Sequence, residues 1–587
     1  MADVDDIPAA GRRKVGWYDP LQLFHTALKV VTSIVFGRNA DNRLIEALAS
    51  EATKPTPYDY SADQRPFWID YISDTGDGWD ATYAVAFVAA QPQLSLPLGD
   101  RKFVTERGSI LVFGGDEVYP TASLYEYQTR LVAPYEAALP ALAPTTPTLD
   151  APSVFAVPGN HDWYDSLVSF SRLFCSKNLF ARWRAPQQRS YFALQLPRGW
   201  WLLGTDIQLG SDLDLPQQRY FEEIAAQISP DDRIILCHAE PHWIYESIYP
   251  PDARDPMKDP AYWAYQALDT LEGVLDHRVA VSLAGDLHHY CRHENQDHVQ
   301  KIVAGGGGAF LHLTNGPDVT TLTNPRTGAV FSHRASWPDR AQSNRLCLNN
   351  LLFPINNLRF GLATGTLYTL VAWVVMAPEI GREHSLWAAI GVILDHAVRD
   401  PGAAFSVIGV FVGFLLFTDT HSKTYRWVGS ILHGLTHLAA LFFVGWAASA
   451  LTAPSGNPSA GQLLLAAPIL FVGGYVAGSV IMGLYLFLSL RLFGRHRNDS
   501  SSALGSPDWK NFLRLRIAED GTLTIFPIGL RRVARRMRAA APGETASRFV
   551  PEGGSAPELI EEPIVVAAPR AASALRASTD PAPSRQP

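Results

Sequence analysis

The tetrapeptide Gly159-Asn160-His161-Asp162 follows the apolar run from Val154 to Val157, and it is one of five segments that decide the fold. In each segment, polar residues come directly after a short apolar run rich in strand-forming residues. Because strand ends in a layered α/β fold meet at one edge, residues far apart in sequence converge there. The pattern therefore predicts an α/β fold with a metal-binding pocket. The other four segments are Asp74-Thr75-Gly76, Gly115-Asp116-Glu117-Val118-Tyr119, His238 and Gly285-Asp286-Leu287-His288.

The residue types in these segments are those that bind metal ions. A carboxylate shared by two cations holds them roughly 3.5 to 4 Å apart, and such a pair clamps the attacking and leaving oxygens of a phosphoryl displacement. Asp116 is the candidate for that bridge. We expect Asp74 and His288 to complete the shell of one metal, and Asn160 and His238 to serve the other. This mixture of oxygen and imidazole ligands suits two divalent or mixed-valent ions of Mn, Fe or Zn.

Two further residues of the third segment are candidates for catalysis. His161 directly follows Asn160 and is expected beside the metals, where it can stabilise the substrate phosphate or protonate the leaving group. Asp162 closes the same segment and is grouped with His161 as a catalytic candidate.

On these motifs the chain resembles the calcineurin-like metallophosphoesterases over about residues 60 to 320. The Gly-Asn-His-Asp and Gly-Gly-Asp segments are the specific parts of the resemblance. The resemblance implies a four-layer α/β/β/α sandwich, a centre of two metal ions, and hydrolysis of phosphate esters by a water molecule that the metals activate.

Two positions depart from the pattern of that family. Gly76 stands where the first motif usually has a histidine. Purple acid phosphatases, one branch of the superfamily, pair Asp-x-Gly with Gly-Asp-x-x-Tyr, and their tyrosine binds a ferric ion. Tyr119 occupies that position, so the resemblance implies a metal ligand, whereas simple packing of a buried tyrosine is the alternative. Asp286 replaces the first histidine of the last motif, and a carboxylate there shifts preference toward Mn or Mg.

Several of these residues also have a purely structural interpretation. A lone histidine after a strand, such as His238, often serves the core, and a Gly-Asp pair is often only a turn. Asp77 and Asp80 lie beside the first motif as alternative ligands to Asp74, although such carboxylates are usually loop residues. Two more histidines, within reach of the motifs, are His242 and His289.

The second half of the chain is predominantly apolar in four stretches. Most are long enough to cross a hydrocarbon core, which needs about 20 helical residues. They predict an all-α transmembrane domain of about four helices within residues 345 to 495. The stretch from Leu386 to Leu394 is a re-entrant or interfacial helix, and a count of five spans is the competing interpretation. The four stretches are residues 360 to 377, 403 to 418, 427 to 451 and 462 to 490.

Basic residues set the expected orientation in the membrane. Lys423 and Arg426 lie between the second and third spans, and further basic residues follow the fourth, whereas residues 452 to 461 carry none. Positive loops face the cytoplasm. Four spans then place the N-terminal domain on the same side, so we expect an integral protein of the plasma membrane with a cytoplasmic catalytic domain. The absence of a signal peptide in residues 1 to 16 and the four scattered cysteines agree with this.

The remaining segments complete the expected domain organisation. Residues 1 to 58 form an N-terminal segment with an amphipathic helix, and residues 60 to 325 form the metallophosphoesterase domain. Residues 506 to 540 form a hairpin around Asp520-Gly521 and a basic run suited to anionic lipid headgroups. Residues 541 to 587 are rich in Pro, Ala and Ser, which predicts disorder.

The sequence therefore predicts a membrane-anchored, cytoplasm-facing phosphatase that depends on metal ions. Its expected partners are membrane lipids and a phosphorylated substrate. Tethering favours a lipid phosphate or lipid-linked pyrophosphate, and soluble nucleotides stay open as the alternative. A net charge of −8 argues against nucleic-acid binding.

The alternative from another class is a transporter or sensor whose phosphoesterase-like domain binds a phosphorylated ligand without hydrolysis. The number of spans motivates this alternative, because a single span would be enough to anchor the domain and four are predicted. His433 and His437, one helical turn apart in the third span, are candidates for a metal or proton site in such a protein. The sequence defines no oligomeric state.

Overall fold

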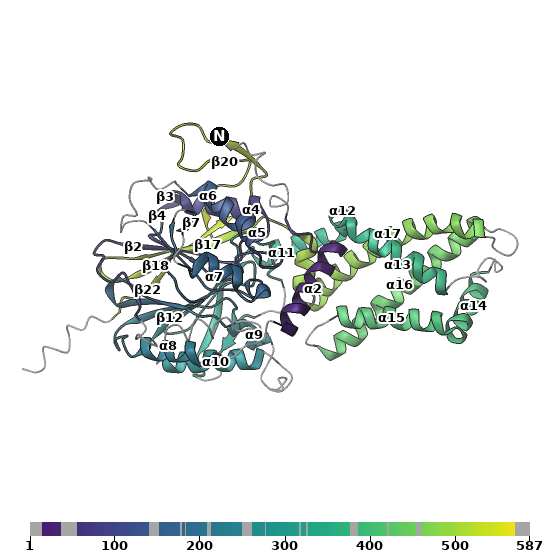
Figure 1. Ribbon diagram of the computed structural model, residues 1–587, viewed down its shortest axis with the longest axis horizontal. Helices are drawn as coiled ribbons and strands as arrows, with labels where there is room; N and C mark the ends of the chain where they lie inside the picture. The colour runs from purple at the N-terminus through teal and green to yellow at the C-terminus, as the bar shows by residue number, and fades with distance from the viewer. Residues whose placement is uncertain are drawn as a thin grey trace, which may run out of the picture.

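The computed structural model of the chain contains an α/β part built on two large sheets and a bundle of long apolar helices that extends from one side of it (Figure 1). The mixed α/β class predicted from the sequence is confirmed. The structure describes residues 14–36, 56–139, 152–176, 179–181, 183–207, 213–248, 261–275, 278–315, 319–324, 327–375, 385–418, 422–452 and 460–569.

The first sheet has three parallel strands near its middle, in the order β2 (Phe67–Ile72), β5 (Ile110–Phe113) and β6 (Ser153–Ala156). Every residue of these strands is buried. Strands covered on both faces read as continuous apolar runs rather than as an alternating pattern, and this is the signal that located them in the sequence. The short strands β8 (Trp183–Arg184) and β7 (Leu179–Phe180) continue the sheet on the β6 side.

The second sheet has four parallel strands at its centre, namely β10 (Trp200–Gly204), β11 (Arg233–Cys237), β12 (Val279–Ala284) and β14 (Gln300–Ala304). Antiparallel strands extend it on both sides, and the full order is β1-β9-β10-β11-β12-β14-β13-β16-β15. The remaining strands are β1 (Tyr58–Asp59), β9 (Phe192–Gln195), β13 (Tyr290–Glu294), β15 (Thr321–Thr323) and β16 (Val330–Trp337).

The two sheets share one apolar core. Ile69 and Val112 of the first sheet belong to the same buried cluster as Leu202 and Ile235 of the second. Helices cover the outer face of each sheet, because their apolar residues join separate clusters with the strands behind them. On the first sheet these are α4 (Trp79–Ala90), α6 (Ala133–Ala138) and α7 (Val168–Phe174), and on the second they are α8 (Leu215–Ala225) and α10 (Ala261–Val274).

Strands from the far end of the chain complete the first sheet. β17 (Lys510–Ile517) pairs antiparallel with β2, and β18 (Leu523–Leu530) pairs with β17 across the turn at Asp520-Gly521. The α/β part is therefore built from residues on both sides of the apolar helices. The expected boundary at residue 325 is also too early, because β16 belongs to the second sheet.

One buried ion pair fastens β17 to β2. The Arg514 guanidinium is fully buried and donates to both carboxylate oxygens of Asp70, through Nε at 2.6 Å and Nη2 at 3.1 Å. Nη2 also donates to the Ala89 carbonyl at 2.9 Å, and the Gly108 amide donates to Asp70 at 3.0 Å. Both charges are thus surrounded by hydrogen-bond partners, as a buried pair requires.

The expectation of disorder from residue 541 is wrong for residues 549 to 566. β20 (Phe549–Glu552) pairs with β19 (Arg536–Ala539), while β21 (Glu558–Leu559) and β22 (Ile564–Val566) pair with β18. The composition of this segment gave no sign of the few apolar residues that these short strands bury against the sheet. Residues 570 to 587, the rest of that expectation, lie outside the described residues.

Among the described residues, three helices are each long and apolar enough to cross a membrane: α13 (Leu358–Val375), α16 (Lys423–Thr452) and α17, which runs from Ala460 to Phe493. A fourth crossing is available if α14 (Leu386–Arg399) and α15 (Pro401–Phe417), bent by 97° relative to each other, form one broken span.

Glycines let α17 pack closely against α13. A Cβ at Gly474 would lie 2.3 Å from Tyr368 Cβ, and one at Gly478 would lie 2.5 Å from Thr364 Cβ. Small residues at this spacing allow helix backbones to approach each other in a membrane.

We predict that Arg514→Ala destabilises the protein by about 3–5 kcal/mol, because it leaves the Asp70 carboxylate buried without its partner. The matched control is Arg516→Ala on the same strand, whose guanidinium lies over the Trp68 ring and whose loss should cost about 1 kcal/mol. Chemical unfolding of the detergent-purified chain measures both. Equal effects of the two substitutions would contradict the role of the ion pair.

Candidate metal centre

Three aspartates of the predicted motifs adopt the left-handed backbone conformation. Asp74 (φ 58°) follows β2, Asp116 (φ 52°) follows β5, and Asp286 (φ 62°) follows β12. Residues with a Cβ rarely adopt this conformation, although aspartate tolerates it better than most. Its repetition at three neighbouring strand ends marks these loops as a functional site, because backbone strain collects at such sites.

Glycines in the neighbouring loops bring the backbone directly against these carboxylates. A Cβ at Gly159 would lie 2.1 Å from Asp116 Oδ1. A Cβ at Gly285 would lie 2.4 Å from Asp74 Oδ2, and one at Gly305 would lie 2.6 Å from the same oxygen. None of these positions has room for a side chain, so the motif glycines are required by the close approach of the loops.

The Tyr119 hydroxyl contacts three of the other predicted ligands. It lies 3.0 Å from Asp74 Oδ1, 3.0 Å from Asp116 Oδ2 and 2.9 Å from His288 Nε2. The four side chains are buried and come from three different loops. The structure therefore brings Asp74, Asp116, Tyr119 and His288 together around one point, as the sequence predicted.

Gly76 explains why tyrosine and glycine occur together here. Gly76 has a φ of +61°, and a Cβ on it would lie 2.4 Å from the Glu117 carbonyl and 2.8 Å from Val118 Cα. The Tyr119 amide also donates to the Gly76 carbonyl at 3.2 Å. A histidine at residue 76 would push away the loop that carries Tyr119, so the glycine makes space for the tyrosine.

His288 is held in one orientation by its surroundings. Its Nδ1 lies 2.9 Å from the Phe310 carbonyl, which can only accept, so Nδ1 carries the proton and Nε2 keeps its lone pair. That lone pair points into the group formed with Tyr119. Burial also lowers the pKa of His288 well below its usual value. A neutral imidazole whose other nitrogen donates to a carbonyl is the usual form of a metal ligand.

Asp286 contributes mainly through its backbone to this group. Its amide donates to Oδ1 and Oδ2 of Asp74, both at 3.0 Å, while its own carboxylate accepts a hydrogen bond from the Tyr245 hydroxyl. Tyr245 belongs to α9 (His242–Ile248) and was not singled out in the sequence.

His161 and Asp162 play different parts in their loop. The His161 amide donates to Asp116 Oδ1 at 2.9 Å, and its Nδ1 lies 2.7 Å from the Pro120 carbonyl, so Nε2 is the nitrogen left for a substrate. Asp162 is fully buried, and its carboxylate accepts from the amides of Gly159 and Glu117 and from the Tyr127 hydroxyl. These bonds make Asp162 a residue that holds the loop.

Asn160 and His238 lie on the loops that border the group. Asn160 stands between Gly159 and His161, which both contact Asp116. The Nδ1 of His238 is 3.1 Å from Thr205 Oγ1. In the part of the chain that the structure describes, no hydrogen bond joins either side chain to Asp116, so their role as ligands stays a prediction.

The two alternative carboxylates of the first motif lie elsewhere. The Asp77 carboxylate accepts from the Val15 amide at 3.0 Å and the Phe310 amide at 3.1 Å, which ties two loops together. Asp80 lies in the first turn of α4. Of the three, Asp74 is the one that contacts Tyr119.

The site concentrates negative charge. Burial raises the pKa of Asp74 well above its usual value, and the neighbouring Asp116 raises it further. Burial also raises the pKa of Asp116 to about 6, and that of Asp286, which Asp116 raises too, to about 6. Glu240, which none of the predicted motifs included, has a pKa raised by burial and by the neighbouring Asp286 and Asp116. Buried carboxylates so close together are either neutralised by protonation or balanced by a bound cation.

The donor set fits a metal ion. Ligand atoms that bind a cation at about 2.1 Å and at right angles lie roughly 3 Å from one another, which matches the spacing around the Tyr119 hydroxyl. Among the described residues, no group of three or more His, Cys, Asp and Glu side chains is by itself arranged to hold a metal. The Tyr119 hydroxyl is the atom that contacts Asp74, Asp116 and His288.

Residues outside the motifs surround the site. His312 stacks on His288, with ring centroids 4.0 Å apart, and its Nε2 lies 3.0 Å from Asn498 Oδ1. Trp17 contacts both Tyr119 and His161, each at 6.0 Å between ring centroids. The sequence held no signal for Trp17 or Asn498, because both reach the site only through the folding of distant segments.

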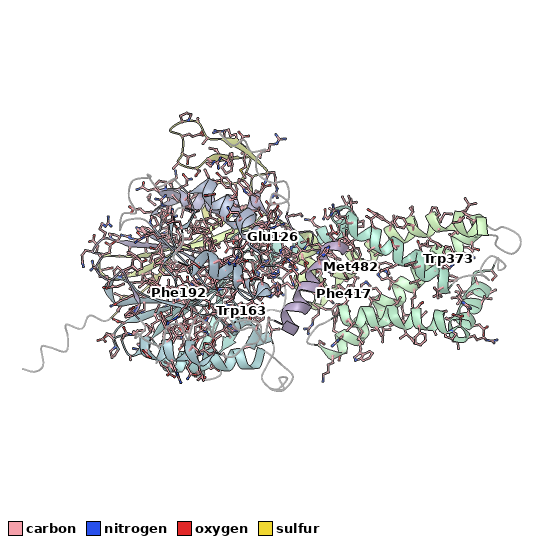
Figure 2. The ribbon with its side chains drawn as sticks, viewed as in Figure 1. Glu126, Trp163, Phe192, Trp373, Phe417 and Met482 are labelled. Atoms are coloured by element: carbon pink, nitrogen blue, oxygen red, sulfur yellow. The ribbon has the colours of Figure 1, made fainter. Side chains whose placement is uncertain are left out.

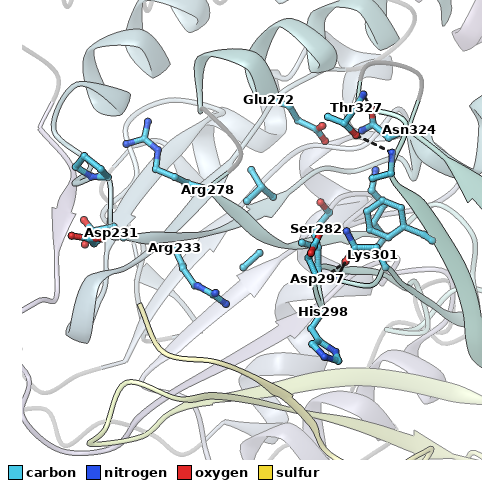
Figure 3. A pocket seen from close by; sticks show the side chains of 18 residues that line it. Asp231, Arg233, Glu272, Arg278, Ser282, Asp297, His298, Lys301, Asn324 and Thr327 are labelled. Carbon is cyan, nitrogen blue, oxygen red and sulfur yellow. Dashed lines mark hydrogen bonds between the residues drawn. The ribbon is translucent and has the colours of Figure 1, made fainter. Parts of the chain in front are cut away.

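A cavity of about 580 Å³ lies away from this site (Figure 3). Its lining includes Asp231, Arg233, Arg278 and Lys301, which come from the starts of β11, β12 and β14 rather than their ends. Ligands of open α/β sheets bind at the carboxyl ends of the strands, so this cavity is not the metal centre.

Comparison with known proteins identifies no family. No family model matches the chain, and no curated protein matches it. The chain is similar to a solved structure of PhoD, with 12% sequence identity and a TM-score of 0.27, over 49% of this chain and 71% of that one. The function must therefore be argued from the residues of the site.

We predict that Asp74→Asn and Asp116→Asn each weaken metal binding by at least about 100-fold. Loss of residues that only support ligands already costs 10–100-fold, and these two carboxylates are in the centre of the group. Asp80→Asn removes a nearby carboxylate outside the group and should retain the metal. Elemental analysis after reconstitution with Mn²⁺ or Zn²⁺ measures this, and equal metal content in all three variants would contradict the assignment.

Proposed function

We propose that this protein is a membrane-anchored phosphoesterase that depends on metal ions, with the two sheets and their outer helices forming a four-layer metallophosphoesterase sandwich. The convergence of Asp74, Asp116, Tyr119 and His288 at the strand ends carries this proposal. Mixed carboxylate, phenol and imidazole donors suit Fe, Mn or Zn, and two such ions would activate water and neutralise the phosphoryl oxygens.

The residues divide into three roles. Asp74, Tyr119 and His288 would hold one ion, Asn160 and His238 would hold the other, and Asp116 would contribute to both. His161 would support the reaction from the neighbouring loop. Its Nδ1–H is engaged by Pro120, so Nε2 would face the leaving group, and in the imidazolium form Nε2 carries the second proton, which it would give to the leaving oxygen. Asp162 positions this loop through the bonds to its buried carboxylate.

The pairing of β2 with β17 supports four membrane crossings. β2 precedes the apolar helices and β17 follows them, yet the two strands share one sheet. A chain that leaves one side of a bilayer and returns to it crosses an even number of times, which favours four crossings over three. α15, with the bend to α14 at its start, would supply the fourth crossing. α14 lies at the end of the bundle farthest from the α/β part, where it would rest at the opposite membrane surface (Figure 1).

Charge supports a cytoplasmic location of the α/β part. Lys423 and Arg426 begin α16, and Arg491 and Arg495 end α17 or follow it, all on the side of the α/β part. Positive residues at helix ends favour the cytoplasmic side. The helix α2 (Pro20–Phe36) lies between the α/β part and the bundle and exposes Leu21, Phe24 and Leu28, as a helix resting in the membrane interface would (Figure 1).

One observation favours a second function, that of a membrane sensor or transporter. Inside the bundle, His433 Nε2 lies 3.2 Å from His437 Nε2, and His437 Nδ1 lies 2.9 Å from the Tyr368 hydroxyl. Ionisable residues in membrane helices are costly and usually functional. Full biological activity in an Asp116→Asn protein, together with its loss in His433→Ala, would favour this function.

The phosphoesterase proposal predicts that Asp116→Asn lowers kcat/KM by at least about 100-fold for phosphate monoesters or diesters, because the buried electrostatic contribution is lost. His161→Asn should lower kcat by about 100-fold or more. Asp231→Asn, in the other cavity, should leave the rate unchanged. Assays of the detergent-purified chain with added Mn²⁺ measure these rates, and identical rates in all variants would contradict the proposal.

The four-crossing topology makes its own prediction. A cysteine replacing Ser455, between α16 and α17, should react with a membrane-impermeant maleimide in intact cells. A cysteine replacing the exposed Ala546 in the α/β part should react only after permeabilisation. Cys175→Ser provides a suitable background, since the other three cysteines are buried. Labelling of both sites from the same side would contradict four crossings.

A further inference from the structure

An apolar cavity of about 470 Å³, partly open to the surroundings, lies between the helices of the bundle. Residues from α13, α15, α16 and α17 line it, including Phe360, Leu367, Phe417, Leu441 and Met482. Its volume is in the range of ligand pockets, and its lining is nearly all hydrocarbon and aromatic. The exceptions include His437 and Tyr368, whose polar atoms already bond to each other, so they do not call for a polar ligand.

The cavity is long and follows the helix axes. It is lined by Phe360 and Val371 on α13, and by Ser406 and Phe417 on α15. At 1.5 Å per residue, each of these pairs is separated by about 16 Å. The hydrocarbon core of a bilayer is about 30 Å thick, so the cavity is about as deep as one leaflet. Its shape therefore matches an extended hydrocarbon chain.

Two glycines create part of the space. Gly409 and Gly413 line the cavity on α15, and a Cβ added at either position would meet no atom within 4 Å. In contrast, the glycines at the α13–α17 contact have no room for a Cβ. The open space beside α15 is thus a local feature of this helix and not a general looseness of the bundle.

One end of the cavity approaches the metal centre through a row of aromatic contacts. Phe360 of the cavity wall contacts Tyr18 with ring centroids 5.7 Å apart, and the adjacent Trp17 contacts Tyr119 and His161. The indole nitrogen of Trp17 is buried and has no hydrogen-bond partner among the described residues. An unused donor thus lies between the cavity and the phosphoester site.

The side-chain view agrees with this arrangement (Figure 2). Trp163, one residue beyond Asp162 of the catalytic loop, lies on the side of the α/β part that faces the bundle. Phe417 and Met482 lie at the near end of the bundle, and Trp373 lies toward its far end. The cavity therefore begins at the end of the bundle that adjoins the metal centre.

We propose that the substrate is a lipid phosphate whose hydrocarbon chain enters this cavity while its phosphate reaches the metal centre. This inference rests on the proposed phosphoesterase function and names its substrate class. Hydrocarbon is the occupant that the apolar lining and the leaflet-length shape select, and the bilayer supplies it. In the reaction, water forms a new bond to phosphorus, the ester P–O bond breaks, and the leaving oxygen takes a proton to give the lipid alcohol and phosphate.

Binding is tested first, by photo-crosslinking. A hexadecyl phosphate with a diazirine in mid-chain is irradiated with the Asp116→Asn protein in phosphatidylcholine nanodiscs, and the labelled peptides are mapped by mass spectrometry. We expect labels within residues 360 to 371 of α13 and 406 to 417 of α15, reduced at least five-fold by Gly413→Phe. Labels spread evenly over the lipid-facing surface, and unchanged by Gly413→Phe, would overturn the proposal.

Activity is tested with a matched pair of esters, hexadecyl phosphate and butyl phosphate. Gly413→Phe should lower kcat/KM for the long ester at least ten-fold more than for the short one, and Gly409→Leu should act in the same direction. Gly391→Phe on α14 is the control, because an added Cβ there also meets no atom and the residue does not line the cavity. Its rates should equal those of the original protein.

The outcomes separate the two proposals. Hydrolysis of both esters with no chain-length effect in Gly413→Phe would overturn the cavity proposal and leave the phosphoesterase function standing. Specific crosslinking without hydrolysis of either ester would overturn the phosphoesterase function and the substrate role, and the cavity would remain a chain-binding site. Hydrolysis with both effects would support the two proposals together.

Discussion

Asp70 and Arg514 connect two segments of the α/β part. In the sequence, all the apolar helices lie between these two segments. The pair is fully buried, and its charges are offset by bonds to each other and to neighbouring backbone groups. Its energetic consequence is asymmetric, since loss of one partner would leave an uncompensated charge in the core. Because this pair joins β17 to β2, it brings the segment that follows the apolar helices back to a sheet that begins before them. The pair thus adds a buried side-chain contact to the backbone pairing and the shared apolar core that join β17 to β2, the strand whose end carries Asp74.

In the candidate metal centre, several carboxylates lie close together because the loops that carry them pack tightly against one another. Left-handed aspartates and motif glycines let the loops touch, and the Tyr119 hydroxyl sits where the ligands meet. Gly76 and Tyr119 are explained together, because the glycine provides the space that the tyrosine loop occupies. A histidine in the first motif and a tyrosine in the second would therefore exclude each other on steric grounds.

The α/β part and the bundle are connected at the catalytic end. Trp17 links the aromatic end of the bundle to Tyr119, and Asn498, just beyond the last apolar helix, bonds to the His312 ring that stacks on His288. Trp17 thus contacts the candidate ligand Tyr119 directly, and Asn498 reaches the candidate ligand His288 through His312.

The sequence by itself determined the features that depend on local pattern. A buried strand followed by a polar loop located Asp74, Asp116 and His288, and long apolar runs located the helices, because strand formation and membrane burial both leave a contiguous signal. The tertiary structure alone decided which distant segments pair. β17 was predicted only as part of a hairpin, because its pairing with β2 depends on a partner more than 400 residues away. The strands of residues 549 to 566 were missed, because a few apolar residues among Pro and Ala form strands here only by packing against a sheet that already exists. The same holds for Trp17, Tyr245 and Asn498: a contact made by long-range folding leaves no period or motif in the sequence.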